Sequence, residues 1–457
     1  MADLRQVFDH IDQHFQRYLD DLYTLLRIPS ISARGTDLET SANAVCALVA
    51  LDGVNPRVLW AESNPCVFAH AQGPPGTRTV LVYGHHDVQP PEPLDGWQSP
   101  PFEPTIRDGK LYGRGTSDNK GQFWATFCAV RALQAVLGCV PAGVKFIIDG
   151  QEESASPHLH KLVAAHHDLL KADFMYWADG SYHPSGRPII CFGVRGILKV
   201  ELRAHTARRN AHSGQFGGIM PNAAQHLMRL IMSMKDADGR VTIKGFYDRV
   251  RPMTAREREV VLQIPWDMES LERQLGITWL DRPLASTGVP FENIMFQPTL
   301  NVAGFSAGYT GPGFQTTIPG EARAKIDMRL VVDQDPDDIW EKFAAHAKAH
   351  TSDAEVIRLG HYHPSRSDLD NPYAPLVIES VRATFGQDPV LYPAIGGSAP
   401  DALFVRGLGI PSMLVPYGNP DQSNHAPNEN FDLECFRRGI KTSAALIYGL
   451  GRLSGTG

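Results

Sequence analysis

The stretch that decides the fold is LVYGHHDVQPPEPLDGW, residues 81–97. Its apolar start, residues 81–83, has the texture of a buried β-strand. His85, His86 and Asp87 follow after a single glycine, and three prolines between residues 90 and 93 prevent the strand from continuing. Two histidines and an aspartate contribute little to a hydrophobic core, so the end of this strand predicts a functional site.

Further apolar runs of strand length lie on both sides of this stretch. They cover residues 58–60, 79–83, 144–148 and 174–178, and helix-like stretches such as residues 122–137 separate them. This alternation predicts an α/β sheet domain. Apolar residues spaced three and four apart predict an opening amphipathic helix over residues 4–26, ending before Pro29.

The texture of the sequence changes near Lys199, where KVELRAHTA reads as an alternating strand. A glycine-rich loop follows, and Pro221 is predicted to open the next helix. An alternating strand over residues 324–332 and a helix capped by Asp335, with Pro336 in its first turn, continue this second unit. HYHPSRSD, residues 361–368, is interpreted as the linker that returns to the first unit, and a last helix is predicted over residues 432–450.

Composition and charge exclude several classes of protein. The 457 residues are 43% apolar and 20% charged, enough for a large core and about two domains. The net charge is −7 without any run of Lys or Arg, so we expect neither a nucleic-acid nor a membrane partner. The six cysteines form no CxxC pair and are interpreted as small buried hydrophobes. No export signal is visible, and a cytoplasmic location is expected.

Acidic and imidazole side chains gather at the ends of the apolar runs, where an α/β sheet binds its ligands. They are His85, Asp87, Asp118, Glu152, Glu153, Asp179 and His425. Burying so many carboxylates together is unfavourable without cations. Two histidines and three carboxylates suit a pair of divalent ions of the Zn, Mn or Co type, with one carboxylate bridging. Such a site is suited to hydrolysis.

The alternation of strand side chains separates the residues of the HHD sequence. His85 and Asp87 share a face, so Asp87 can orient the His85 imidazole, whereas His86 points away and is not expected to be a ligand. One residue of the Glu152–Glu153 pair can bind metal while the other accepts a proton as a general base.

The sequence as a whole resembles the M20 family of cocatalytic metallopeptidases, near its carnosine-dipeptidase branch. The resemblance is carried by YGHHDVQPPEPLDGWQSPPFEPTIRDGKLYGRGTSDNKGQ, DGQEESASP, AHSGQFGG, YTGPGFQTTIPGEARAKIDMRLV, GGSAPD and NHAPNEN, in this order. It implies that His85 and Asp179 bind one metal ion, that Glu153 and His425 bind the other, and that Asp118 bridges them. It also implies Glu152 as the general base and Asp87 as the supporting aspartate.

The same resemblance implies substrate-binding roles for residues outside the metal set. His212 would stabilise the oxyanion in the site of the partner subunit of a homodimer, and Arg329 would bind the substrate carboxylate. Further substrate contacts are implied for Thr316, expected from the partner subunit, and for His361, Gly397 and Ser398. The implied architecture is a catalytic α/β domain with a central mixed sheet flanked by helices, residues 1–197 and 364–457, and an inserted α+β lid and dimerisation domain, residues 198–363.

One residue departs from the family pattern. Dipeptidase members commonly carry an acidic residue before the paired glycines of GGS, where it helps to receive the free amino group of the substrate; here the residue is Ile395. The resemblance predicts a hydrolase that uses two divalent ions, most simply Zn with Mn or Co also suitable, to cleave a dipeptide or short peptide. Because of Ile395, N-acyl or N-carbamoyl amino acids are kept as the alternative substrates.

Other readings of the sequence have less support. GFSAG, residues 304–308, matches the G-x-S-x-G motif of serine hydrolases, but the glycines and proline that follow do not suit the helix that a nucleophile elbow requires. Neither a P-loop nor a GxGxxG after a strand is present. A binding protein that has lost catalysis would be expected to lack a ligand or the base, and all of them are present.

Overall fold

The computed structural model describes residues 2–50, 54–278, 289–351 and 353–453. The chain forms two compact units. Unit 1 contains Met1–Gly193, Arg366–Pro393 and Pro400–Gly457, and unit 2 contains Val194–Ser365 and Ala394–Ala399. No described helix is both long enough and apolar enough to cross a membrane.

Unit 1 is built on an eight-stranded sheet in the order β1-β2-β6-β3-β7-β18-β8-β17. Its strands are β1 (Arg57–Ala61), β2 (Asn64–Ala71), β3 (Thr79–His85), β6 (Gly143–Asp149), β7 (Phe174–Trp177), β8 (Ile189–Cys191), β17 (Val390–Tyr392) and β18 (Ser412–Leu414). The neighbours β6, β3, β7 and β18 run parallel, whereas β1, β2 and β6 are joined in antiparallel pairs. The predicted α/β fold with a mixed sheet is confirmed.

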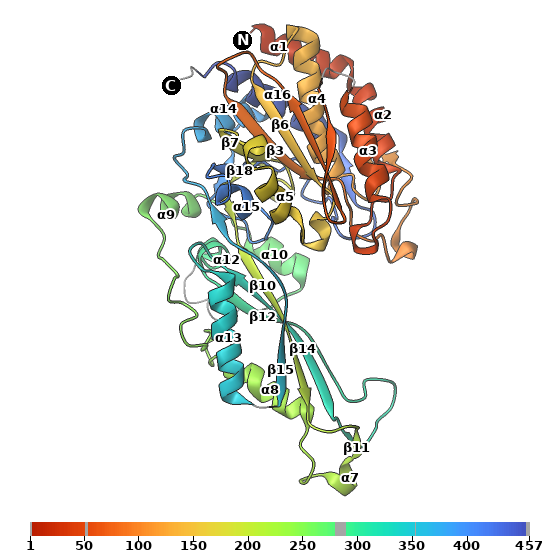
Figure 1. Cartoon of the computed structure of the whole chain (residues 1–457), viewed down its shortest axis with the longest axis vertical. Helices are drawn as coiled ribbons and strands as arrows, with labels where there is room; N and C mark the ends of the chain where they lie inside the picture. The colour runs from red at the N-terminus through yellow and green to blue at the C-terminus, as the bar shows by residue number, and fades with distance from the viewer. Residues whose placement is uncertain (1, 51–53, 279–288, 352, 454–457) are drawn as a thin grey trace. The chain divides into compact units, whose positions relative to one another are not determined.

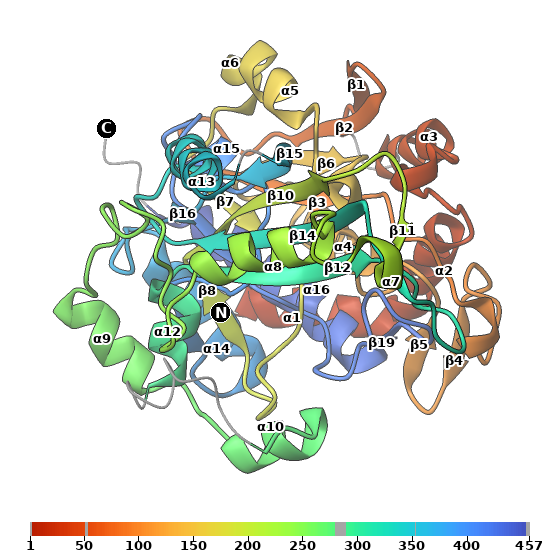
Figure 2. The same cartoon turned by 90° about the horizontal axis from the view of Figure 1, so that it is seen from below.

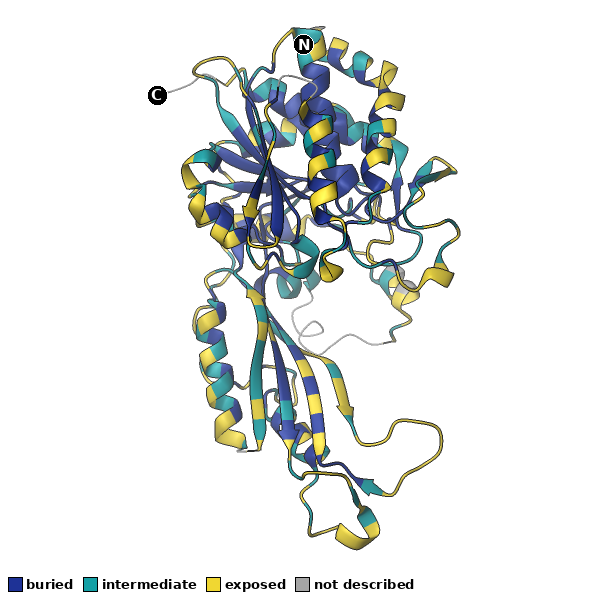
Figure 3. Ribbon diagram, turned by 45° about the vertical axis from the view of Figure 1, so that its right-hand side comes forward, coloured by how far each residue is buried: buried dark blue, intermediate teal, exposed yellow. Residues whose placement is uncertain are grey.

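The central strands are buried on both faces because helices cover the sheet. In Figure 3 these strands are mostly dark blue, and β7 is buried along its whole length. The helices of unit 1 are α1 (Ala2–Gln13), α2 (Phe15–Leu26), α3 (Leu38–Val49), α4 (Lys120–Leu137), α5 (Leu159–Ala165), α6 (His167–Leu170), α14 (Ala374–Phe385), α15 (Ala402–Val405) and α16 (Leu433–Leu450). Helix α16 packs against α1, α4 and α14, and α4 contacts β3 (Figure 1).

The opening helix differs from the prediction because it is two helices. The break lies at His14, whose backbone leaves the helical region at φ −108° and ψ 13°. The apolar spacing continues through the break, since Ile11 and Phe15 are both buried, so periodicity alone could not reveal it. The predicted last helix is confirmed, and Asp432 caps it by accepting from the backbone N–H of Glu434.

Unit 2 contains a four-stranded antiparallel sheet in the order β12-β14-β10-β15. The strands are β10 (Gly196–His205), β12 (Thr299–Ala307), β14 (Glu321–Leu330) and β15 (Ala354–Tyr362), and the small pair β11 (Ala211–His212) and β13 (Thr317–Ile318) forms a separate ribbon. Helices α8 (Ala223–Ser233) and α13 (Pro336–His350) contact the sheet and each other, and Figure 2 shows α8 lying over the strands. Burial alternates along β14, as expected for a sheet with one covered face.

Local signals in unit 2 were partly right. Asp335 caps α13 and Pro336 takes its first turn, as predicted. The start of α8 was wrong: Asn222 accepts from the backbone N–H of Gln225 as the N-cap, and Pro221 lies before the helix. His361 belongs to strand β15, so the return linker begins later than predicted.

Two further interpretations are settled by local structure. Most of the GFSAG sequence lies in strand β12, and no helix follows within the described residues 308–316, so the nucleophile elbow is absent there. Cys66, Cys128 and Cys191 are buried as predicted, whereas Cys139 is exposed.

Candidate metal centre

The sheet of unit 1 brings the candidate ligands to one edge. Strands β6, β3, β7 and β18 are parallel neighbours, so their carboxyl ends meet at the same edge. His85 ends β3, Asp179 follows β7, and Glu153 lies in the short 3₁₀ helix η4 (Glu152–Ser154) after β6. His425 lies on the loop after β18, and Asp118 lies two residues before the start of α4.

The five predicted ligands form two groups of three that share Asp118. In the first group, His85 Nε2 lies 3.1 Å from Asp118 Oδ1 and 3.6 Å from Asp179 Oδ2. In the second, His425 Nε2 lies 2.9 Å from Asp118 Oδ2 and 3.3 Å from Glu153 Oε2. The potential ligand atoms of each group lie within 4.8 Å of one another. The two oxygens of Asp118 therefore face different groups, and the peptide between Asp118 and Asn119 is cis.

Asp87 joins the first group to the turn that carries the glutamates. Its carboxylate lies 3.3 Å from His85 Nδ1, and the His85 Nδ1 also lies 3.1 Å from the Asp87 carbonyl oxygen. The same carboxylate accepts from the backbone N–H groups of Glu152 at 3.1 Å and Glu153 at 3.0 Å. His86 points elsewhere, with its Nε2 2.8 Å from the Pro65 carbonyl oxygen. His85 Nε2 is thus left to face the ligand group.

The electrostatics of the cluster favour added positive charge. Burial, followed by the Asp118 charge, raises the pKa of Glu153 to about 7. Burial likewise raises the pKa of Asp179 and holds the pKa of Glu152 well above its usual value, with neighbouring carboxylates acting in the same direction. Hydrogen bonds to Asp118 and Glu153 raise the pKa of His425 to about 10. The raised pKa values mean that these groups bind a proton more tightly than usual, because negative charge and burial surround them. A metal cation placed among them would be stabilised by the same negative charge.

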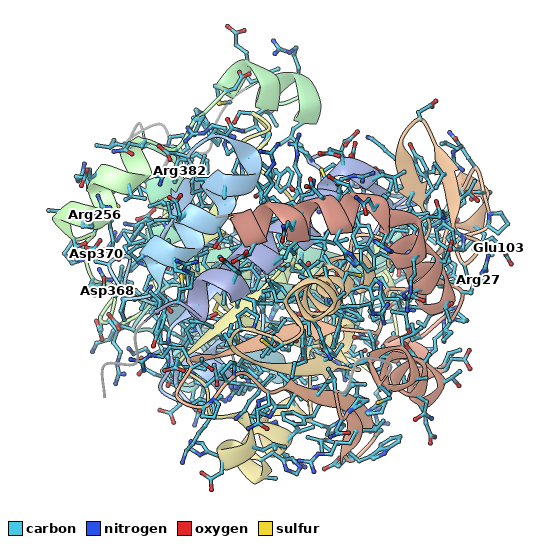
Figure 4. All side chains as sticks on the ribbon, turned by 90° about the horizontal axis from the view of Figure 1, so that it is seen from above. Arg27, Glu103, Arg256, Asp368, Asp370 and Arg382 are labelled. Atoms are coloured by element: carbon cyan, nitrogen blue, oxygen red, sulfur yellow. The ribbon has the colours of Figure 1, made fainter. Side chains whose placement is uncertain are left out.

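The residues fit a pair of divalent cations. Glu153 Oε1 is a buried carboxylate oxygen that has no hydrogen-bond partner among the described residues, as expected for an oxygen that binds an ion. Each group offers imidazole nitrogen and carboxylate oxygen, a mixed set that suits Zn, Mn and Co. Asp118 is buried and Asp179 and Glu153 are partly buried, in contrast to charged residues that are exposed on unit 1, such as Arg27, Glu103 and Arg382 (Figure 4).

Comparison with known proteins identifies the family. The model of peptidase family M20/M25/M40 matches residues 81–449. The chain belongs to this family. A metallo-carboxypeptidase of family M20 from Sulfolobus solfataricus has a solved structure that is 33% identical, with a TM-score of 0.89 over 95% of this chain and 99% of its own. The predicted family and enzyme class are confirmed.

Two dipeptidases are also similar to this M20 peptidase along most of its length. Beta-Ala-His dipeptidase of Homo sapiens is 28% identical over 98% of this chain and 93% of its own. The solved structure of the di-peptidase Dug1p from Saccharomyces cerevisiae is 25% identical, with a TM-score of 0.83 over 99% of each chain. The similarity therefore covers both units, and the relatives are peptidases whose names specify dipeptides or a carboxyl-terminal residue.

Unit 2 of this M20 peptidase carries the remaining predicted site residues in separate places. His212 is the last residue of β11 and Thr316 directly precedes β13, and His212 Nε2 lies 3.3 Å from Thr316 Oγ1. Arg329, near the end of β14, donates to Ser398 Oγ at 3.0 Å.

Gly397 and His361 make their described contacts through neighbours in unit 2. The Gly397 carbonyl accepts from the Arg195 backbone N–H at 3.0 Å. His361 lies opposite Leu198 in the sheet, and burial, then the Arg358 charge, lowers its pKa. The substrate-binding roles of the residues in unit 2 stay predictions.

The structure also reveals supporting residues that the sequence reasoning missed. Gln89 donates to Glu153 Oε2 at 2.8 Å, and Asn119 joins the His85 backbone N–H to the Ala178 carbonyl. Glu429 accepts from the backbone N–H of Asp118 at 3.0 Å. Gln89 and Asn119 lie within the quoted HHDVQ and SDNKG sequences, so their closeness to predicted ligands was a usable signal. Glu429 also lies in a quoted sequence, NHAPNEN, four residues after His425, but it is more than 300 residues from Asp118 and nothing in that sequence predicts its contact with the Asp118 loop.

Proposed function

We propose that this M20 peptidase is a two-metal hydrolase that cleaves the amide bond of a dipeptide or short peptide next to a free carboxylate. The observation that carries the proposal is the pair of ligand groups sharing Asp118, with Glu152 beside them and in neither group. The names of its relatives, a Beta-Ala-His dipeptidase, a di-peptidase and a metallo-carboxypeptidase, support a peptide substrate.

His85 and Asp179 would hold one ion, Glu153 and His425 the other, and Asp118 would contribute one oxygen to each. We assign zinc as the simplest occupant, with Mn and Co as alternatives that the same ligands suit. When bound, the two ions supply Lewis-acid polarisation of the scissile carbonyl and make a water molecule more acidic.

Glu152 is assigned as the general base. Its raised pKa suits a group that accepts a proton from the attacking water and then delivers it to the leaving amine. Asp87 holds the Glu152 backbone and the His85 ring with the same carboxylate, so it fixes the base relative to the first ligand group.

Unit 2 is proposed to bind the substrate, and the boundaries 1–197 with 364–457 and 198–363 are proposed for the catalytic and the lid domains. Arg329 is assigned to the substrate carboxylate, which a guanidinium can bind through two parallel hydrogen bonds. The Ser398 hydroxyl at 3.0 Å orients this guanidinium and supports the assignment. His212 is assigned to the oxyanion, and Thr316, His361 and Gly397 to further substrate contacts.

The length of β14 supports a homodimer. Arg329 lies near one end of this strand, and the β11 strand that carries His212 lies beyond the other end (Figure 1). The eight residue-to-residue steps from Glu321 to Arg329 span about 26 Å of extended chain. A dipeptide is only about 7 Å long, so one copy cannot place both side chains on the same substrate. If both act on it, His212 comes from the partner subunit.

Exposed apolar side chains of unit 2 give this dimer a surface. Phe216, Ile219, Met232 and Phe314 are between 43% and 87% exposed, and apolar exposure of this kind is typical of interaction sites. Phe216 and Ile219 follow His212 closely in the chain, and Phe314 closely precedes Thr316. The assigned partner contacts therefore lie beside the apolar residues that a second copy would cover.

A second substrate class is favoured by Ile395. This apolar residue is partly buried, its Cδ1 lies 3.5 Å from the position of a Cβ at Gly397, and it pairs with Val194. An apolar side chain offers no partner to a free ammonium group, but it can pack against an acyl group. N-acyl and N-carbamoyl amino acids are therefore the alternative substrates of the same site.

One experiment tests the proposal and separates the two substrate classes. Protein depleted of metal by chelation is titrated with Zn, Mn or Co while bound ions are counted and turnover is measured. Matched substrates with the same carboxyl-terminal residue carry a free, an acetylated or a carbamoylated amino group. Two ions per chain and metal-dependent amide cleavage are expected. Full activity of protein proven to be metal-free would refute the two-metal mechanism.

A further inference from the structure

Glu429 is a buried carboxylate at the metal centre that belongs to neither ligand group. It is 0% exposed and accepts four hydrogen bonds. Oε2 accepts from Arg114 Nη1 at 2.7 Å and from the Gly115 backbone N–H at 3.0 Å. Oε1 accepts from the backbone N–H groups of Ser117 and Asp118, both at 3.0 Å. One side chain thus holds the loop that ends in the shared ligand Asp118.

Pairing of short strands places Glu429 under this loop. Strand β19 (Asn430–Asp432) pairs with β5 (Lys110–Tyr112), with Asn430 opposite Tyr112. The pairing continues beyond the two strands, because the backbone N–H of Gly113, next to β5, donates to the carbonyl of Glu429, next to β19, at 3.0 Å. The position of Glu429 against the loop is therefore set by the backbone of β5 and β19.

The segment that carries Glu429 also carries His425. Asn424 Nδ2 lies 3.5 Å from Asp118 Oδ2, and Gln422 Oε1 accepts from the Ser117 hydroxyl. The backbone N–H of Asn430 donates to the Gln422 carbonyl at 2.9 Å, which closes the segment on itself. Movement of Glu429 would therefore change the positions of two predicted ligands, Asp118 on one loop and His425 on the other.

Burying the charge of Glu429 is energetically unfavourable, so we expect its position to serve a purpose other than stability. Glu429 is 0% exposed, and its carboxylate lies against the loop that carries Asp118. Arg114 is only 1% exposed, so both charges of the pair are removed from water. Buried ion pairs contribute little net stability, and their best-attested use is to specify one arrangement.

We propose that Glu429, supported by Arg114, is a positioning residue that fixes the Asp118 carboxylate between the two metal positions. The inference rests on the proposed two-metal function. Among the described residues, Asp118 alone is present in both ligand groups, so displacement of its backbone weakens both ion sites together. Loss of Glu153 or Asp179, by contrast, removes a ligand from one group.

Glu429→Gln tests the proposal because it keeps the shape of the side chain but replaces one acceptor oxygen by an NH₂ group. Its amide NH₂ must face two of the four donors, so two hydrogen bonds are lost. The affinity of the metal-free protein for each of two Zn ions is measured by competition with a chromophoric chelator. Affinity for both ions should fall by about 10- to 100-fold, the usual effect of removing a residue that orients a ligand. With both sites saturated by excess Zn, kcat should fall while KM changes less than about twofold.

Asp21→Asn is the matched control for general destabilisation. Asp21 pairs with the largely buried Arg131, which joins α2 to α4 away from the described ligands. Unfolding of the metal-free variants is followed by circular dichroism so that the two losses of stability can be compared. Asp21→Asn should retain wild-type affinity for both ions. If it weakens Zn binding as much as Glu429→Gln at equal stability, the positioning role is refuted.

Arg114→Met is the second variant if Glu429→Gln does not fold. It keeps Glu429 and the three backbone N–H donors but removes the cation that holds the carboxylate in place. A weaker loss of affinity at both sites is expected. Wild-type affinity in a folded variant of either kind, or loss of one ion alone, would overturn the inference. Failure of the wild-type protein to bind two ions would instead refute the proposed function.

Discussion

Replacement of Glu152 by Gln separates the proposed base from the proposed ligands. The substitution keeps the length of the side chain and the backbone N–H that donates to Asp87 Oδ1 at 3.1 Å, so the turn is retained. Loss of the proton-carrying group should lower kcat at least about 100-fold. This corresponds to about 2.7 kcal/mol of transition-state free energy. Because Glu152 belongs to neither ligand group, the variant should still bind two ions.

Glu153→Gln is the matched control, since it makes the same chemical change in the adjacent residue of the same turn. Glu153 belongs to the group of Asp118 and His425, and its Oε1 has no hydrogen-bond partner among the described residues. This variant should lose the ion beside His425 and retain about one ion per chain after dialysis. Elemental analysis gives the metal content, and kcat is measured with saturating substrate and metal. More than about a tenth of wild-type kcat in Glu152→Gln, or loss of an ion from it, would refute its assignment as the base.

Four further outcomes are expected. Mixing inactive Glu152→Gln with inactive His212→Ala should restore activity through hybrid dimers, and no rescue despite proven subunit exchange would contradict a shared site. Arg329→Met should lower kcat/KM for a substrate with a free carboxylate by about 10- to 150-fold, but not for the matched amide, as expected for a charged hydrogen bond. Ile395→Asp should shift selectivity from N-acetyl toward free-amine substrates, measured as the ratio of their kcat/KM values. Chelation should destabilise the protein, by about 2.7 kcal/mol for each site that was filled at 100 times its Kd, as followed by thermal unfolding.

The positions of the strand-end ligands could be predicted because a local pattern marks them. His85 and Asp179 follow apolar runs directly, and these runs are the neighbouring parallel strands β3 and β7. Parallel neighbours bring their carboxyl ends to one edge whatever the sequence between them. Recognition of the strands therefore predicted that these residues lie at one edge of the sheet, and the pairing of β3 with β7 brings the two together.

Contacts between distant segments of irregular structure could not be predicted in this way. Arg114 and Glu429 are 315 residues apart, and each lies in a loop where charged residues are common. Their pairing depends on the register of β5 with β19, two three-residue strands that carry almost no periodic signal. The break at His14 was missed for a different reason, since the apolar spacing runs through it.

The sheet places three ligands, but it does not place His425. Strands β6 and β18 are separated by β3 and β7, which puts the starting points of Glu153 and His425 about 14 Å apart. Yet His425 Nε2 lies 3.3 Å from Glu153 Oε2. The loop after β18 must cross the edge of the sheet, and its contacts with the Asp118 loop determine where it stops. Glu429 follows His425 by four residues, and its buried carboxylate accepts hydrogen bonds from the Asp118 loop. It therefore links the position of His425 to the position of Asp118, so the second ion site depends on Glu429 as well as on its own ligands.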